Sequence, residues 1–103
     1  MGVTDRSDLK VWVVEALRQL GGSAGIVSVC KRVWQLHEAD LRGSGDLFYT
    51  WQYDIRWAAQ YLRNVGLLLA VDKSRTKDWE LSPVGRSIAL GDIVSKAQRK
   101  TRD

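Results

Sequence analysis

The chain has 103 residues, of which 45% are hydrophobic and 27% charged, so we expect a single globular domain with its own core. No apolar run approaches the roughly 20 residues that a membrane-spanning helix needs, and the first residues do not resemble a secretory signal, so a cytoplasmic location is expected. Cys30 and His37 are the single cysteine and histidine, which excludes an intramolecular disulfide and disfavours a zinc site. No metal and no cofactor are expected.

The formal net charge is +4 at pH 7. Basic side chains concentrate in the segment 72–78 and in the last nine residues, namely Lys73, Arg75, Lys77, Lys96, Arg99, Lys100 and Arg102. This distribution favours a polyanionic partner, although a solvated surface with a frayed polar tail would give the same pattern. We therefore expect one folded domain over residues 1–94 and a flexible basic tail over residues 95–103.

Three amphipathic helices are predicted from apolar residues that recur every three or four positions. The first begins at residue 7 or 8 and ends at residue 20, before two glycines. A turn or a brief strand over 22–25 precedes a long second helix over 26–41. After a glycine-rich loop over 42–46, the third helix covers about 50–65, with Asp46 or Thr50 as its N-cap and Gly66 after its last turn.

Two strands and a fourth helix are predicted in the remaining chain. Strands over 67–71 and 79–81 would form a hairpin around the charged loop 72–78, which is longer than a tight turn. Ser82 supplies a capping hydroxyl and Pro83 suits the first helical position, so a helix is expected through residue 89, with Ile93 as an open extension. The predicted fold class is mainly α with a small β-hairpin, in the order α-α-α-β-wing-β-α of a winged helix-turn-helix domain.

Two segments resemble a known family. The stretch YDIRWAAQYLRNVGLL over 53–68, followed by WELSPVG over 79–85, is similar to the N-terminal winged-helix domain of the Mrr family of modification-dependent restriction enzymes. The similarity covers most of the chain, and its specific part begins after Tyr49. In that family a separate nuclease domain follows the winged helix, and this chain has no room for one. The resemblance implies DNA binding and a link to restriction or defence systems, and it implies nothing about cleavage.

The outer face of the third helix carries side chains suited to reading base edges. Tyr53, Arg56 and Gln60 lie opposite its apolar face. They are candidates for DNA contact because arginine can pair with guanine and glutamine with adenine in the major groove. Further candidates lie at the borders of this face or near the helix start, namely Thr50, Gln52, Trp57 and Arg63. An alternative interpretation is that these residues are simply solvated, since any helix exposes arginine and glutamine to water.

The loop between the predicted strands is the second candidate contact. Each of five consecutive side chains can donate a hydrogen bond to phosphate, namely Lys73, Ser74, Arg75, Thr76 and Lys77. Phosphate contacts of this kind position a protein on DNA without reading sequence. A solvated hairpin tip would have the same composition, so the loop supports DNA binding chiefly together with the helix before it.

Trp57 borders both faces of the third helix, and two roles are weighed for it. We favour packing under the fourth helix or the wing over an edge that faces the DNA groove. Trp34 and Trp51 are assigned to the core. Trp12 lies beside the main apolar stripe of the first helix and is interpreted either as a lid on the core or as a contact with a partner.

No catalytic constellation is recognised in the sequence. His37 lacks a positioned nucleophile, and it is interpreted as a half-buried or partner-facing side chain. The Glu-x-Lys element of common restriction nucleases is absent, and so is a glycine-rich phosphate loop with its lysine. We therefore expect a protein that is not an enzyme.

The sequence thus predicts a non-enzymatic protein that binds double-stranded DNA, with helix 50–65 in the major groove and the wing 72–78 on the backbone. It could serve in a restriction, defence or modification-sensing system with a partner protein, or as a dimeric transcription regulator. A different class of function is a protein interaction module that docks through Trp12, Tyr49 and Tyr53.

Overall fold

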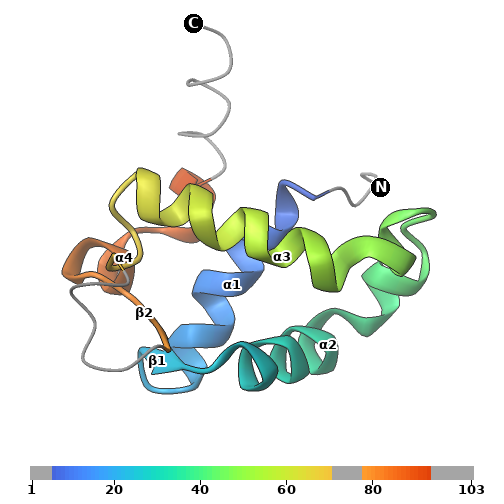
Figure 1. The fold of residues 1–103 in the computed structure, drawn as a ribbon, viewed down its shortest axis with the longest axis horizontal. Coiled ribbons are helices and arrows are strands. Elements are labelled where there is room, and N and C mark those ends of the chain that lie inside the picture. The colour runs from blue at the N-terminus through green and yellow to red at the C-terminus, as the bar shows by residue number, and fades with distance from the viewer. Residues whose placement is uncertain (1–5, 71–77, 94–103) are drawn as a thin grey trace, which may run out of the picture.

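The computed structural model describes residues 6–70 and 78–93, and it is mainly helical. The elements are α1 (Asp8–Gln19), β1 (Ser23–Ala24), α2 (Ile26–Arg42), α3 (Leu47–Asn64), β2 (Trp79–Glu80) and α4 (Pro83–Ser87). Helix α1 contacts α2, α3 and α4, while α3 extends across it and joins α2 through a short loop (Figure 1). None of the described helices is long and apolar enough to cross a membrane. The predicted mainly α fold with a small antiparallel sheet is confirmed.

The core forms where the apolar faces of α1 and α3 meet. Leu9, Val13 and Leu17 of α1 are spaced four residues apart and have no exposed surface. On α3, Ile55 and Leu62 are equally buried and face the same cluster. Complete burial of a leucine or isoleucine side chain contributes about 1.5–3 kcal/mol, so this stripe holds α3 in place and fixes which of its sides faces outward.

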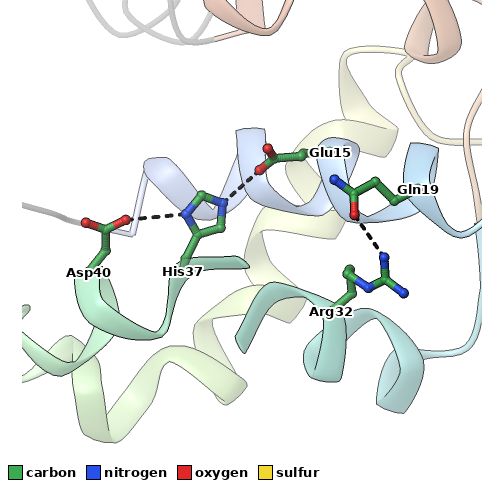
Figure 2. A network of polar contacts seen from close by, with 5 residues as sticks. All are labelled: Glu15, Gln19, Arg32, His37 and Asp40. Atoms are coloured by element: carbon green, nitrogen blue, oxygen red, sulfur yellow. Dashed lines mark hydrogen bonds and ion pairs between the residues drawn. The ribbon is translucent and has the colours of Figure 1, made fainter. Parts of the chain in front are cut away.

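Helix α2 is attached to α1 by polar as well as apolar contacts (Figure 2). The ring of His37 stacks on that of Trp12, with centroids 4.1 Å apart, and its Nε2 lies 2.7 Å from Glu15 Oε1. One turn of α2 away, Arg32 donates to the side-chain oxygen of Gln19 at 2.9 Å. His37 is thus half-buried in an internal contact, and Trp12, only 7% exposed, is a lid on the core and not a surface for a partner.

The backbone of α2 departs from helical geometry at His37, where φ is −132° and ψ is 24°. The sequence pattern predicted one uninterrupted helix. The kink lies at the residue whose ring contacts Trp12 and Glu15 of α1. The predicted bounds of α1 and α2 otherwise hold to within one or two residues.

The sheet differs from the predicted hairpin. Strand β2 pairs antiparallel with β1, which the sequence suggested only as a turn or brief strand. The predicted strand 67–71 contributes a single bridge between Leu68 and Leu81 and a 2.8 Å hydrogen bond from the Leu69 N–H to the Glu80 carbonyl oxygen. β2 therefore lies between β1 and the chain that leaves α3, because a strand has two hydrogen-bonding edges and both are used here.

Helix α4 is shorter than predicted. Ser82 caps it by accepting from the Gly85 N–H at 3.1 Å, as expected, but Ile88 is extended with ψ of 143°. Arg18 of α1 donates to the Gly85 carbonyl oxygen at 3.0 Å and also to that of Ile88. These carbonyl groups are satisfied by a side chain, so the helix ends instead of continuing to residue 89. A new helical turn occupies 90–93, and its Ile93 is buried.

The start of α3 also differs from its expected cap. Asp46 occupies the N-cap position, but its side chain makes no capping hydrogen bond. Thr50 lies inside the helix, where its hydroxyl donates to Asp54 Oδ2 at 2.8 Å. At the other end Gly66 has φ of +83°, the left-handed conformation predicted after the last turn.

Candidate nucleic-acid interface

The outward side of α3 is a row of long polar and aromatic side chains. Its members, spaced three or four residues apart, are exposed and are Tyr49, Tyr53, Arg56, Gln60 and Asn64. Tyr49 and Tyr53 are 83% and 77% exposed, which is high for tyrosine. We call these five residues the outer α3 face. It projects away from the contacts of α3 with α1 and α2, so nothing in the described chain covers it.

The predicted contact residues beside the outer α3 face differ in exposure and in whether their side chains are hydrogen-bonded within the protein. Gln52 is exposed on the side toward α2, whereas the hydroxyl of Thr50 is held by Asp54 on the side toward α1. Asp54 is the single acidic residue of α3, against Arg56 and Arg63. Its bond to Thr50 directs the carboxylate along the helix, so the outer α3 face itself carries no negative charge.

Trp57 is half-buried between α3 and the start of α1. The guanidinium carbon of Arg6 lies 4.1 Å from its ring centroid, and Lys10 Nζ lies 4.8 Å from it. The same Lys10 Nζ is 3.9 Å from the ring of Tyr61, one turn further along α3. Packing was the favoured role for Trp57, and the half-buried ring contacts the start of α1. Helix α4, one expected partner, is not among these contacts, and the other expected partner, the wing, lies outside the described residues.

The C-terminal half of the outer α3 face is ordered by its own hydrogen bonds. Gln60 donates through Nε2 to Asn64 Oδ1 at 3.1 Å and accepts from Arg63 Nη1 at 3.4 Å. Arg63 is half-buried, and its Nε has no hydrogen-bond partner. Gln60 is therefore held with its amide at the surface, while Arg63 lies further toward the border than Arg56 does.

The predicted wing residues, Lys73, Ser74, Arg75, Thr76 and Lys77, lie outside the described residues, as does the basic tail. The chain on both sides of the loop is described. The bridge between Leu68 and Leu81 brings the two flanking segments together beside the end of α3.

An apolar groove lies between α2 and α3, on the side of α3 next to its outer face. Its volume is about 670 Å³. Its apolar lining comes from both helices and consists of Ile26, Val27, Cys30, Trp34, Phe48 and Trp51. Its polar lining is Lys31, Gln35, Gln52 and Arg56. We refer to these ten residues as the α2–α3 groove.

The charge of Arg56 affects the pKa of Cys30, and both residues line the α2–α3 groove. Burial raises the pKa of the Cys30 thiol, and the nearby Arg56 guanidinium partly offsets this by favouring the thiolate. The positive charge of Arg56 thus reaches into the groove from the edge of the outer α3 face. Among residues 6–70 and 78–93, no group of three His, Cys, Asp or Glu side chains could hold a metal ion.

The sequence analysis left Tyr49 and Asn64 out of the DNA contacts and named Tyr49 only as a residue for docking on a protein. Both continue the spacing of Tyr53, Arg56 and Gln60, so the helical period alone would have added them to the DNA contacts. The sequence pattern gave a weaker indication of the α2–α3 groove than of the outer α3 face. Val27 and Trp34 lie seven residues apart on the flank of α2, but their proximity to Phe48 depends on how the two helices pack.

No protein-family model matches the chain, and neither a curated protein nor a solved structure matches it. The resemblance to the Mrr N-terminal domain, expected from the segments 53–68 and 79–85, therefore stays a prediction.

Proposed function

We propose that this protein is a non-enzymatic winged-helix protein that binds double-stranded DNA, with α3 in the major groove. The observation that carries the proposal is the outer α3 face, a helix surface of Tyr53, Arg56 and Gln60 that is exposed and free of carboxylates. An α-helix fits the major groove of B-DNA, where arginine and glutamine pair with the edges of guanine and adenine.

The wing is the second part of the proposal. The segment 72–78 follows α3 and returns into β2, the position from which a basic loop can reach the phosphate backbone beside a groove-bound helix. Its lysines and arginine would supply affinity that does not depend on sequence. The net charge of +4 favours approach to a polyanion as well.

A role in sensing modified DNA, within a restriction or defence system, follows from the similarity to Mrr. Tyr53 is the residue we assign to such sensing. Its exposed ring could cover a methyl group that projects into the major groove. A transcription regulator is the neighbouring alternative, and it would require a homodimer on a palindromic site.

Titration of labelled random duplexes, with and without base methylation, tests the proposal. Affinity should fall steeply with salt, and Arg56→Ala should weaken binding to a preferred site by about 1–3 kcal/mol. Arg86→Ala on α4 is the matched control, because Arg86 is also an exposed arginine but lies beside Gly21 and Gly22 and is not part of the outer α3 face. Replacing Lys73, Arg75 and Lys77 together should weaken binding to all duplexes equally.

The competing function is a protein interaction module. The exposure of Tyr49 and Tyr53 favours it, whereas the burial of Trp12 removes one of its three predicted docking residues. Such a module would show no salt-dependent duplex binding. Absence of duplex binding at low salt would therefore reject the DNA-binding proposal.

A further inference from the structure

The α2–α3 groove has the size and walls of a small-molecule site. Pockets for small ligands typically enclose about 300–1,000 Å³ and are lined mainly by apolar and aromatic groups. The groove measures about 670 Å³, and the rings of Trp34 and Trp51 lie nearly parallel with centroids 6.1 Å apart. Phe48 adds a third ring, 6.4 Å from that of Trp34. Aromatic walls of this kind suit a flat, apolar ligand body.

The polar lining of the groove selects the charge of the ligand. Lys31 and Arg56 are cationic, Gln35 and Gln52 are neutral amides, and none of the ten lining residues is a carboxylate. Cys30 and Arg56 both line the groove, so the guanidinium charge lies within reach of its interior. An anionic group beside the apolar walls would be attracted by both cations and could accept charge-assisted hydrogen bonds.

We propose that the α2–α3 groove binds an amphipathic aromatic anion, with its ring system against Trp34, Trp51 and Phe48 and its anionic group at Lys31 and Arg56. Val27 forms part of the rim and is 65% exposed. A ligand seated against it would cover this apolar surface.

Ligand binding is also expected to oppose DNA binding, a step that rests on the proposed function. Gln52 and Arg56 line the groove and are also candidate DNA contacts. An anion paired with Arg56 would neutralise the cation that we assign to a base edge. The groove would then act as an effector site that releases the protein from DNA.

Fluorescence titration of the purified protein with anilinonaphthalene sulfonate, an aromatic anion, tests the site. The neutral analogue phenylnaphthylamine is the comparison for charge. The anion should bind saturably and more tightly than the neutral compound. Val27→Glu should weaken anion binding at least about tenfold, because it adds a like charge at the rim. Val84→Glu, which alters a 52% exposed valine on α4, should leave binding unchanged.

A second pair of variants tests the cations. Replacing both Lys31 and Arg56 by Gln should weaken the sulfonate about tenfold or more and leave the neutral compound unaffected, since a charged hydrogen bond is lost. Arg86→Gln is the control. Thermal melts of all variants verify folding, and bound probe should slow alkylation of Cys30 in the wild type. Equal sulfonate binding by Val27→Glu and Val84→Glu, or no preference for the anion, would overturn the proposal.

Competition between the sulfonate and a labelled duplex separates this site from the proposed function. If the protein binds the probe at the groove but binds no duplex, the ligand site stands and the DNA-binding proposal fails. If it binds duplex equally well with the groove saturated, the effector role is refuted. Displacement of duplex by the probe in wild type, but not in Val27→Glu, supports both.

Discussion

Replacement of Trp57 by alanine distinguishes packing from DNA contact at the most ambiguous residue of α3. A fully buried tryptophan costs about 3–5 kcal/mol when truncated to alanine. Trp57 is half-buried, which reduces the packing contribution to about 2 kcal/mol. The cations of Arg6 and Lys10 above its ring together add about 0.5–1 kcal/mol. We therefore expect Trp57→Ala to lower the free energy of unfolding by about 3 kcal/mol.

Thermal denaturation followed by circular dichroism measures this loss. For a domain of this size each kcal/mol lowers Tm by about 4–8 °C, so the expected decrease is about 12–24 °C. Trp57→Phe keeps an aromatic ring beneath the cations and should lose less than half as much. Tyr53→Ala is a matched surface control, because this ring is 77% exposed, and should change stability by at most about 0.5 kcal/mol.

Duplex binding measured well below the melting temperature completes the experiment. If Trp57 is a packing residue, the folded Trp57→Ala protein should bind DNA with nearly wild-type affinity. An unchanged Tm together with impaired binding, most clearly to methylated duplexes, would refute the packing argument and place the indole at the DNA.

Two further predictions concern close packing and thiol chemistry. Gly85→Ala should destabilise the protein by about 1–3 kcal/mol, because the added Cβ would lie 2.1 Å from the Leu67 carbonyl oxygen. Gly91→Ala is the control and should not destabilise it, because no atom lies within 4 Å of a Cβ at that position. Chemical denaturation of both variants measures the difference. Alkylation of Cys30 by iodoacetamide should reach half its maximal rate at a higher pH than alkylation of a free cysteine, because burial disfavours the thiolate and raises the pKa of Cys30. Arg56→Gln should move this midpoint to still higher pH, and a midpoint that does not move would argue against the proximity of Arg56 to the thiol.

Helices α1, α2 and α3 were predictable because their apolar spacing repeats over twelve or more residues. The buried side of α1 is marked by Leu9, Val13 and Leu17, and that of α3 by Ile55 and Leu62. In each helix the buried side also determines which side is exposed. The outer α3 face could therefore be derived largely from the sequence. Its two omitted members, Tyr49 and Asn64, follow the same period.

Features made by distant segments could not be derived in this way. Strand β1 has two residues, and its pairing with Glu80 depends on how α1 and α4 pack. The end of α4 depends on Arg18, which lies 67 residues before Gly85 in the chain. The kink at His37 likewise accompanies a ring in α1. In each case the deciding partner is remote in sequence, so local periodicity carries no information about it.

The two proposed sites share Arg56, and this sharing determines how variants must be interpreted. Loss of DNA binding in Arg56→Ala would fit removal of a base contact, but this residue also supplies charge to the α2–α3 groove. Gln60 and Tyr53 belong to the outer α3 face and lie outside the groove, whereas Val27 lines the groove and lies outside the face. Variants at these three positions separate the functions. If the groove regulates DNA binding from a separate site, Gln60→Ala should impair duplex affinity without affecting binding of the aromatic anion. Val27→Glu should impair binding of the anion without affecting duplex affinity.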